Sequence, residues 1–495
     1  MPGQTHFRTV FSLALACVLL LLYPIRACTQ QAPSGSDENS LVFKADAAYR
    51  SGQLDAARQL LEEALRLDPR LARAHALLGL VLARQNAVQG ALRNLGEAHQ
   101  IEPDNPDYAY DYAVLLLQGR RFAAAIPILE ALHRRSPKAD DVLVNLARAY
   151  AGTHESTKLS ALPSALDSAQ YTNESLLKTL ATILAGNGQP VAVEQLWKAA
   201  INHDPNSPLP YAALAKLWIA GGDAHRAQAL LAGAPPVARG PLYLYAQGET
   251  QMALRNYDPA ISSFSKLIRQ APGNQVAWHE LVKCNMLADR LSQADEDAQE
   301  AAGQFPGAVE FEYQQAVINY MLGRTTTAIR LLSPILEKGE GNDPRAALLM
   351  AVLRSQLGEY GEATRYFKRA ETLDRGCNAL TSYFYGTTLL RMHQTAPAAA
   401  QLRNAIHCRP HFGLAEFRLG QALLQSGLLH QALALLQQAT QDDSTVAEPY
   451  YALAQVRRRL GDQAGAQADL RQFNALHKHI AHSDRDLFRP SEAEN

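Results

Sequence analysis

From residue 38 to about residue 480 the chain repeats a pair of short amphipathic segments every 33 to 35 residues. Within each segment, large apolar residues recur at the i, i+3, i+4 spacing that places them on one side of an α-helix. Position 15 of each unit, between the two segments, is Gly or a polar residue. The pattern predicts thirteen helix–turn–helix hairpins. They begin at residues 38, 72, 106, 140, 174, 208, 241, 275, 309, 344, 379, 413 and 447.

Two positions of the unit carry small residues. Position 8, in the first helix, is Ala or Gly in twelve of thirteen units, with Val282 as the exception, and position 20, in the second helix, is Ala in eleven. Small side chains at both positions let the two helices approach closely, and pairs such as Leu78 with Leu95 fill the space beside them. Seven units have Pro at position 32, where its ring prevents the second helix from continuing.

In its period, its small residues and its Pro positions, the repeat resembles the tetratricopeptide-repeat (TPR) family over about nine tenths of the chain. Leu41–Pro69 and Ala346–Asp374 are good copies of the family pattern. The resemblance implies an all-α fold, a right-handed α-solenoid of about thirteen TPR helical hairpins. It also implies a concave face, lined by the first helices, that binds an extended peptide or a partner helix.

The repeat departs from its pattern at two places. In the fourth unit, residues 153–160 are polar and Pro163 falls within the second helix, so we expect a distorted or extended hairpin. The sixth unit ends early at residues 233–236 (Gly-Ala-Pro-Pro), which favours a flexible joint. We therefore expect an N-terminal array over 41–235, a C-terminal array over 241–480 and a disordered tail over 481–495.

Positions 2, 5, 9 and 12 of each unit are expected to face the concave groove. Position 5 carries a spaced row of aromatic residues, which offer a large contact area and a hydroxyl group for a bound peptide. The same row also fits a packing role, because Tyr is common at this position in the family. The predicted partner-binding residues are Tyr110, Lys178, Tyr245, His279, Tyr313, Tyr383, Phe417 and Tyr451.

The first forty residues differ from the repeats. An uncharged stretch from Val10 to Tyr23 is too short to span a bilayer as a helix, so a signal peptide over 1–27 fits better than a retained anchor, which stays open. Residues 25–28 (Ile-Arg-Ala-Cys) resemble the bacterial lipobox, in which the Cys is lipidated, although Arg26 departs from that pattern. Either Cys28 is lipidated or the chain is cleaved after Ala27. Residues 28–40 are polar and are expected to form a flexible tether.

Charge and motifs argue against several classes of function. The chain has 47 Lys and Arg and 48 Asp and Glu, so no net field attracts nucleic acid, and we expect none as a partner. No phosphate-binding, zinc-protease, nucleophile-elbow or paired CxxC motif is present, so we predict no catalytic residue, no metal and no cofactor. His477, His479 and His482 are not spaced to share one helical face.

Two cysteines are brought together by the predicted fold. Cys377 precedes the first helix of the eleventh unit and Cys408 lies near the end of its second helix. Antiparallel packing makes these two ends neighbours, so an oxidising compartment would allow a disulfide. Two reduced thiols are the alternative. Cys284 is expected to be a buried small hydrophobic residue.

Together these features predict an exported bacterial protein that is periplasmic or tethered to a membrane by its N-terminal signal or lipid alone. We expect a noncatalytic scaffold or adaptor that binds protein or peptide partners and helps to assemble, secrete or localise them. The alternative is a regulatory subunit that recruits a separate envelope enzyme.

Overall fold

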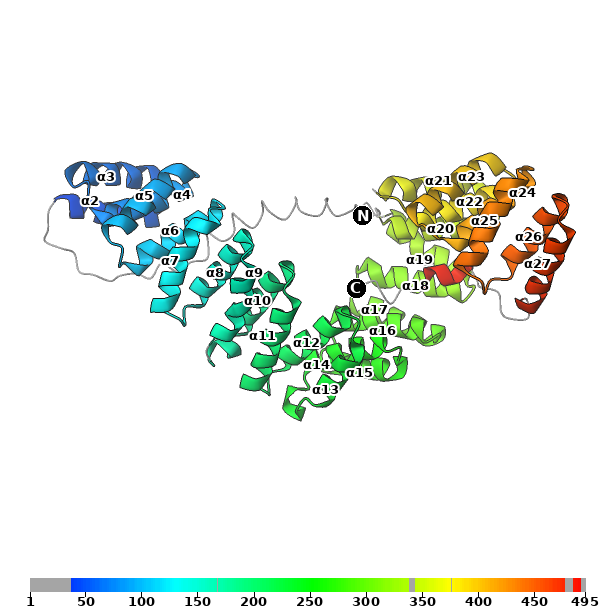
Figure 1. The fold of residues 1–495 in the computed structure, drawn as a ribbon, viewed down its shortest axis with the longest axis horizontal. Coiled ribbons are helices and arrows are strands. Elements are labelled where there is room, and N and C mark those ends of the chain that lie inside the picture. Colours follow the sequence, from blue (N-terminus) through cyan, green and yellow to red (C-terminus); the bar gives the residue numbers. More distant parts are fainter. Residues whose placement is uncertain (1–36, 167, 338–342, 375, 477–483, 491–495) are drawn as a thin grey trace. The chain divides into compact units, whose positions relative to one another are not determined.

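The computed structural model describes residues 37–166, 168–337, 343–374, 376–476 and 484–490. Every regular element in these ranges is a helix, and the helices form consecutive antiparallel hairpins (Figure 1). Each first helix begins at the predicted residue or one residue away from it. The prediction of an all-α solenoid with thirteen hairpins is therefore confirmed.

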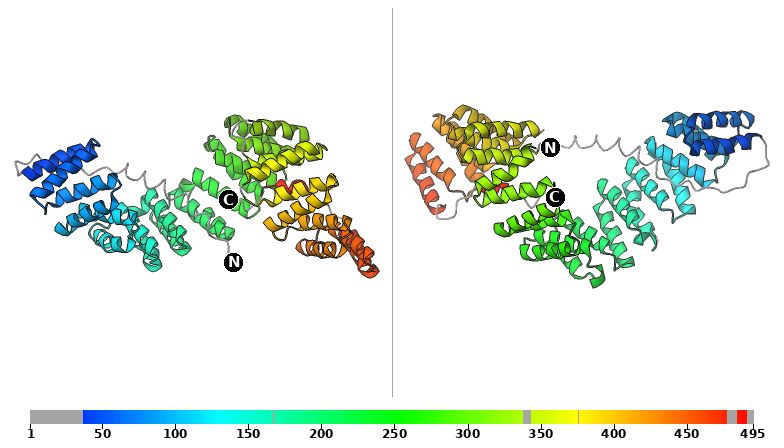
Figure 2. Two further views of the ribbon diagram at one scale, coloured as in Figure 1. Left: turned by 90° about the horizontal axis from the view of Figure 1, so that it is seen from above. Right: turned by 180° about the vertical axis from the view of Figure 1, so that it is seen from behind.

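The described chain forms two compact units, the first made of residues 37–222 and 230–239 and the second of residues 223–229 and 240–490 (Figure 2). The predicted folding of 41–235 and 241–480 as separate arrays remains a prediction. The first helices of hairpins one to six are α2 (Asp37–Arg50), α4 (Ala72–Arg84), α6 (Pro106–Gln118), α8 (Asp140–Thr153), α10 (Glu174–Gly186) and α12 (Pro208–Ala220). Their second helices are α3 (Leu54–Leu67), α5 (Val88–Ile101), α7 (Phe122–Arg135), α9 (Ser156–Ala161), α11 (Pro190–His203) and α13 (Ala224–Ala232).

Hairpins seven to thirteen follow the short 3-10 helix η3 (Pro236–Ala238). Their first helices are α14 (Pro241–Ala253), α16 (Gln275–Leu287), α18 (Val309–Met321), α20 (Pro344–Gln356), α22 (Ala379–Arg391), α24 (Gly413–Gln425) and α26 (Glu448–Arg459). Their second helices are α15 (Tyr257–Gln270), α17 (Leu291–Gln304), α19 (Thr325–Glu337), α21 (Tyr360–Leu373), α23 (Thr395–Cys408), α25 (Leu429–Asp442) and α27 (Gln463–Leu476). A further 3-10 helix, η4 (Asp484–Phe488), comes after α27.

The turn inside every hairpin is made the same way. In all thirteen hairpins, position 15 adopts a positive φ, from 55° at Arg120 to 88° at Gly461. This left-handed conformation lets the chain reverse directly after the first helix, and Gly adopts it without steric cost. Asn86 and Asp289 are residue types that tolerate it. The Gly or polar residue at position 15 is therefore explained by the left-handed backbone conformation that the turn requires.

Close packing within the hairpins explains the small residues. A Cβ atom added at Gly79 would lie 2.6 Å from Leu95 Cγ, and one added at Gly248 would overlap the ring of Phe264. Both contacts join position 8 of the first helix to position 24 of the second. At position 20, Ala57 and Ala363 are fully buried. The small positions thus set the distance between the paired helices, as the sequence predicted.

The fourth hairpin is distorted, as its polar stretch and Pro163 predicted. Its second helix α9 has six residues and is followed by two 3-10 helices, η1 (Leu162–Ala165) and η2 (Gln170–Thr172). Tyr171 is buried there, stacks on His203 with 4.5 Å between ring centroids, and donates a hydrogen bond to the carbonyl of Pro163. Tyr171 thus packs the space that the shortened second helix of this hairpin leaves.

Two predicted segments at the chain ends need correction. The tether was expected to reach residue 40, but α2 already begins at Asp37, which with Glu38 gives this helix an acidic first turn that favours helix initiation. The tail was expected to be disordered from residue 481, but residues 484–488 form η4. Leu487 and Phe488 are partly buried and pack against the core of the second unit.

The signal peptide over 1–27, Cys28 and the tether up to residue 36 lie outside the described residues. Within the described ranges, no helix combines the length and apolarity that crossing a membrane requires.

Candidate protein-binding faces

In both units the first helices of neighbouring hairpins approach one another. The pairs α2 with α4 and α8 with α10 are in contact in the first unit, and α16 with α18 through α24 with α26 in the second. Among neighbouring second helices of the described residues, only α9 and α11, beside the distorted fourth hairpin, make a comparable contact. Each stack therefore bends toward its first helices, which line the inner face of each unit.

Position 5 of the first helix ties one hairpin to the next. Asn145 Nδ2 donates a 3.1 Å hydrogen bond to the Tyr110 hydroxyl, and Gln314 Nε2 lies 2.9 Å from His279 Nδ1. In both pairs the partner occupies position 6 of the following hairpin. Asn145 and Gln314 are buried, at 4% and 7% exposure. Position 5 therefore connects adjacent hairpins in addition to any role toward a partner.

Tyr245 and Tyr313 are half-buried on the inner face of the second unit. Tyr245 packs edge-on against Phe264, and its burial, together with the carboxylates of Glu249 and Glu280, raises the pKa of its hydroxyl. The hydroxyl thus stays protonated at neutral pH. The Tyr313 ring lies under the Arg345 guanidinium, whose central carbon is 4.6 Å from the ring centroid. This cation–π contact again joins neighbouring hairpins.

Two residues of the predicted row are not available to a partner. Tyr383 is fully buried and Phe417 is 5% exposed. The Tyr383 ring contacts those of Phe384 and Phe412, at centroid distances of 5.1 and 5.2 Å. Their prediction as groove contacts is wrong, because the hairpins here pack closely enough for position 5 to enter the hydrophobic core.

Two residues of the row are exposed. Tyr451 is 47% exposed on α26 and Lys178 is exposed on α10, where its Nζ lies 3.3 Å from Glu174. The first helices before and after α10 also carry an exposed basic residue. These are Arg148 on α8 and Lys216 on α12, both at position 9 of their hairpins. The first unit therefore presents basic side chains on three successive first helices. In the second unit position 9 is more enclosed, and Lys283 is 3% exposed.

A segment of the chain itself lies against the first helices of the second unit. Figures 1 and 2 show η4, in red, beside α18. The Phe488 ring contacts Tyr320 on α18 and Phe384 on α22, at centroid distances of 5.3 and 5.2 Å. The Arg485 guanidinium carbon lies 5.8 Å from the centroid of the Tyr320 ring.

An ion pair fixes the other end of this segment. Arg489 Nη2 lies 2.8 Å from Asp289 Oδ1, in the turn between α16 and α17. Asp289 and Phe384 were not among the predicted binding residues, and Tyr320 was included only through its position 12. The sequence signal that could have found the segment is the pair Leu487–Phe488, two large apolar residues in an otherwise polar tail.

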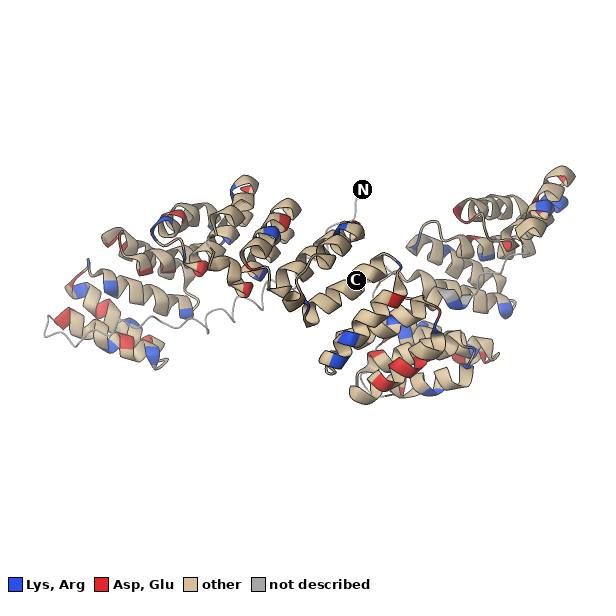
Figure 3. Cartoon of the chain, turned by 90° about the horizontal axis from the view of Figure 1, so that it is seen from below, with Lys and Arg blue, Asp and Glu red and all other residues tan. Residues whose placement is uncertain are grey.

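The charges of the described residues do not form one extended field. Figure 3 shows Lys and Arg interspersed with Asp and Glu. Helix α17 is rich in acidic residues, among them Asp295. Asp295 pairs with Arg324 at 2.9 Å. Local charges of both signs can therefore orient a partner.

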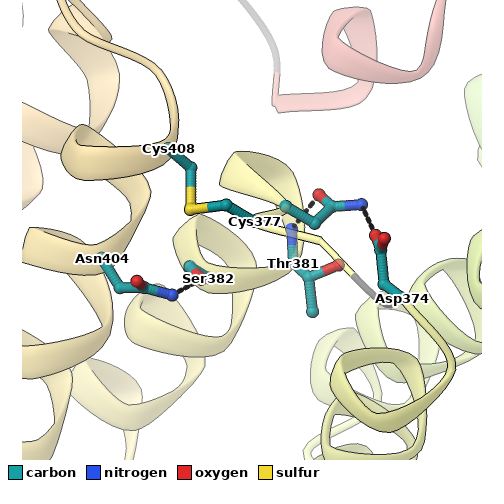
Figure 4. The surroundings of a disulfide bond; sticks show 7 residues. Asp374, Cys377, Thr381, Ser382, Asn404 and Cys408 are labelled. Carbon is teal, nitrogen blue, oxygen red and sulfur yellow. Dashed lines mark hydrogen bonds between the residues drawn. A yellow bond between two sulfur atoms is a disulfide. The ribbon is translucent and has the colours of Figure 1, made fainter. Parts of the chain in front are cut away.

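The two cysteines of the eleventh hairpin form a disulfide in the structure (Figure 4). Their Cα atoms are 5.2 Å apart, and the bond joins the segment before α22 to the last residue of α23. Nearby, Asn378 caps α22 by accepting a hydrogen bond from the Thr381 amide, and Asn404 Nδ2 donates one to Ser382 Oγ at 2.7 Å. Cys284 is a buried free thiol, as expected.

Within the described ranges, no group of three His, Cys, Asp or Glu side chains is arranged to hold a metal ion. His477, His479 and His482 lie outside those ranges. Cys408 is in the disulfide, and His411 pairs with Asp442 at 3.0 Å.

Comparison with known proteins identifies the repeats. Models of the TPR repeat match residues 45–86, 89–140 and 386–447. The chain therefore contains tetratricopeptide repeats in these segments, near both ends of the stack of hairpins.

One curated relative is cellulose synthase 1 operon protein C of Komagataeibacter xylinus, which is 28% identical over 292 residues, 57% of this chain. The match spans only 20% of that protein. Among solved structures, the APC/C hetero-tetramer Cut9–Hcn1 is 14% identical, with coverage of 90% of this chain and 95% of that one and a TM-score of 0.41. Yeast Tom70 is also 14% identical, with coverage of 89% and 96% and a TM-score of 0.41.

Proposed function

We propose that the protein is a noncatalytic scaffold of the bacterial cell envelope that binds protein partners along the first-helix faces of its two units. The observation that carries this proposal is the seating of residues 485–489 on the inner face of the second unit through aromatic and arginine contacts. A face that accommodates one peptide segment has the width and chemistry to accommodate another.

The two units offer different surfaces to such partners. The first unit presents Arg148, Lys178 and Lys216 in succession, which suits an acidic segment. The second presents aromatic side chains around Tyr320, which suit an apolar or aromatic segment. A chain with two such faces can hold two partners together, as assembly, secretion or localisation requires.

An envelope location is supported by the sequence of residues 1–40, with its signal-like stretch and the lipobox-like residues 25–28. A tether and a stack of hairpins together would hold partners at a distance from a membrane. The second candidate function is a regulatory subunit that recruits a separate envelope enzyme, and one observation favours it. The relative at 28% identity is named for a cellulose synthase operon, which suits a partner that acts on a polysaccharide.

Site-specific photocrosslinking in intact cells tests the scaffold. A photoreactive amino acid would replace Lys178, Lys216 or Tyr451 on first helices, and Arg66 or Lys266 on exposed second-helix positions as matched controls. We expect discrete protein adducts from the first-helix positions alone, identified by mass spectrometry. Equal adducts from both sets would contradict binding through the inner faces. Capture of one enzyme at fixed stoichiometry would favour the regulatory subunit.

A further inference from the structure

The C-terminal segment 485–489 makes the kind of contacts that a bound peptide makes. Its sequence is Arg-Asp-Leu-Phe-Arg, and it is the part of the chain after α27 that returns to the ninth hairpin. Phe488 contacts rings on α18 and α22, two helices that belong to different hairpins. The Phe488 side chain thus contacts first helices of two different hairpins, as the side chain of a bound peptide would.

The surface that the segment contacts is aromatic. Tyr320 is fully buried in the presence of the segment, with Phe488 and Arg485 against its ring. Its hydroxyl accepts a 3.3 Å hydrogen bond from Gln356 Nε2 on α20, which fixes the ring. Aromatic groups held in one place are typical of protein-binding surfaces.

The segment is short and its apolar side chains are only partly buried, so we expect that another peptide can replace it. η4 is one short 3-10 turn, and its ion pair with Asp289 is exposed at the Asp289 side chain, which is 70% accessible. Exposed ion pairs of this kind contribute little to stability. Burial of Leu487 and Phe488 is only partial, so both remain within reach of solvent.

We propose that this face of the second unit is a specific peptide-binding site and that residues 485–489 are its displaceable intramolecular occupant. The site takes a peptide with an aromatic residue followed directly by arginine, and a second arginine three positions before the aromatic residue. A partner that presents this arrangement competes with residues 485–489 for the site. The tail therefore lowers the apparent affinity of the site for such a partner. This proposal rests on the proposed scaffold function and specifies the ligand of one of its two faces.

The expected size of the effect follows from the tether. A segment joined by a short connection is present at an effective concentration of about 1 mM, so a peptide with a Kd of about 0.1 mM would bind the covered site about tenfold more weakly. Removing the anchoring side chains should restore the full affinity. The test therefore compares one peptide on chains that differ only in the tail.

The probe is a fluorescein-labelled synthetic peptide with the sequence of residues 484–490, and its binding is measured by fluorescence anisotropy. The full chain carrying Phe488→Ala and Arg489→Ala should bind the peptide about tenfold more tightly than the unmodified chain. A full chain with Phe43→Ala and Arg458→Ala, which changes an exposed aromatic residue and an exposed arginine elsewhere, should bind like the unmodified chain. A peptide with alanine in place of Phe488 should not bind.

A second variant tests the site from its other side. Asp289→Asn, added to the tail variant, should weaken peptide binding about two- to fivefold, because it removes the ion pair while Asn tolerates the positive φ of 59° at this position. If the tail variant, with an unchanged circular dichroism spectrum and melting temperature, binds the peptide no better than the unmodified chain, the proposal is wrong. A concentration-dependent dimer that disappears in the tail variant would also overturn it, since the tail would then occupy a second copy.

The outcome separates this inference from the proposed function. If partners are captured by photocrosslinking but the peptide does not bind the uncovered site, the scaffold stands and the assigned ligand is wrong. If the peptide binds as expected but no partner is captured, the site exists and the scaffold role in cells is wrong.

Discussion

At the scale of single residues, a buried acid on α24 links stability to pH. Glu416 is 3% exposed, and its burial together with the adjacent carboxyl of Asp442 raises its pKa to about 7. Burial would also raise the pKa of Asp442, but hydrogen bonds from Glu416, Gln438 and His411 lower it below its usual value. The two acids thus share one proton, which Glu416 holds.

The raised pKa of Glu416 fixes the sign of the pH dependence. The folded chain holds this proton to a higher pH than the unfolded chain, so its stabilising contribution is complete below pH 4.5 and is lost as the pH rises through about 7. Glu416→Gln keeps the size and removes the titration. We expect the unmodified chain to lose about 1–3 kcal/mol more than this variant between pH 5 and pH 8.

Chemical denaturation at several pH values measures this difference. Asp442 does not interfere, because its lowered pKa places its titration below this range. His411→Asn is the matched control, since it removes the remaining titratable group of the cluster and Asn tolerates the positive φ of 62°. If Glu416→Gln leaves the pH dependence of the free energy of unfolding unchanged, Glu416 is not the group responsible.

At the scale of elements, the contact between positions 8 and 24 sets how closely paired helices pack. Gly248 leaves space for the Phe264 ring, and an added Cβ would overlap it. Gly248→Ala should therefore lower the free energy of unfolding by about 1–3 kcal/mol. Gly303→Ala, on α17 with no atom near the added Cβ, should be neutral or stabilise by up to about 1 kcal/mol. Thermal unfolding compares them, and equal effects would contradict this account.

The disulfide of the eleventh hairpin joins two elements that the repeat already makes neighbours. It closes a loop of 31 residues, so replacing Cys377 and Cys408 by Ser should lower stability by about 3–4 kcal/mol. The difference between the variant and the unmodified chain should vanish in reductant. Peptide mapping of chain purified from its native compartment without reduction should find the linked pair. Two free thiols there would place the chain in a reducing compartment and contradict export.

At the scale of the whole molecule, the N-terminal residues decide where the two units work. If Cys28 is lipidated, cells fed a labelled palmitate should incorporate it into the unmodified chain and not into Cys28→Ser. Cys17→Ser, which changes the cysteine of the apolar stretch, is the matched control and should retain the label. Label that survives Cys28→Ser would refute lipidation and leave cleavage after Ala27 or a retained anchor.

Local sequence patterns are sufficient to specify the hairpins. The number of hairpins, the residue at which each begins (to within one residue) and the distortion of the fourth hairpin follow from local patterns. The reason is that position 15 requires a left-handed turn and positions 8 and 20 require small side chains. Each hairpin contacts only its neighbours, so a local pattern is sufficient to specify it.

The accessibility of residues on the inner face depends instead on how the hairpins pack in three dimensions. Tyr110, Tyr383 and Tyr451 share position 5, yet Tyr383 is buried and Tyr451 is exposed, because the depth of this position depends on how closely consecutive hairpins pack. The seating of Phe488 on α18 and α22 is a contact between residues more than 100 positions apart. No repeating pattern encodes such a contact, since it depends on the path of the chain after the last repeat.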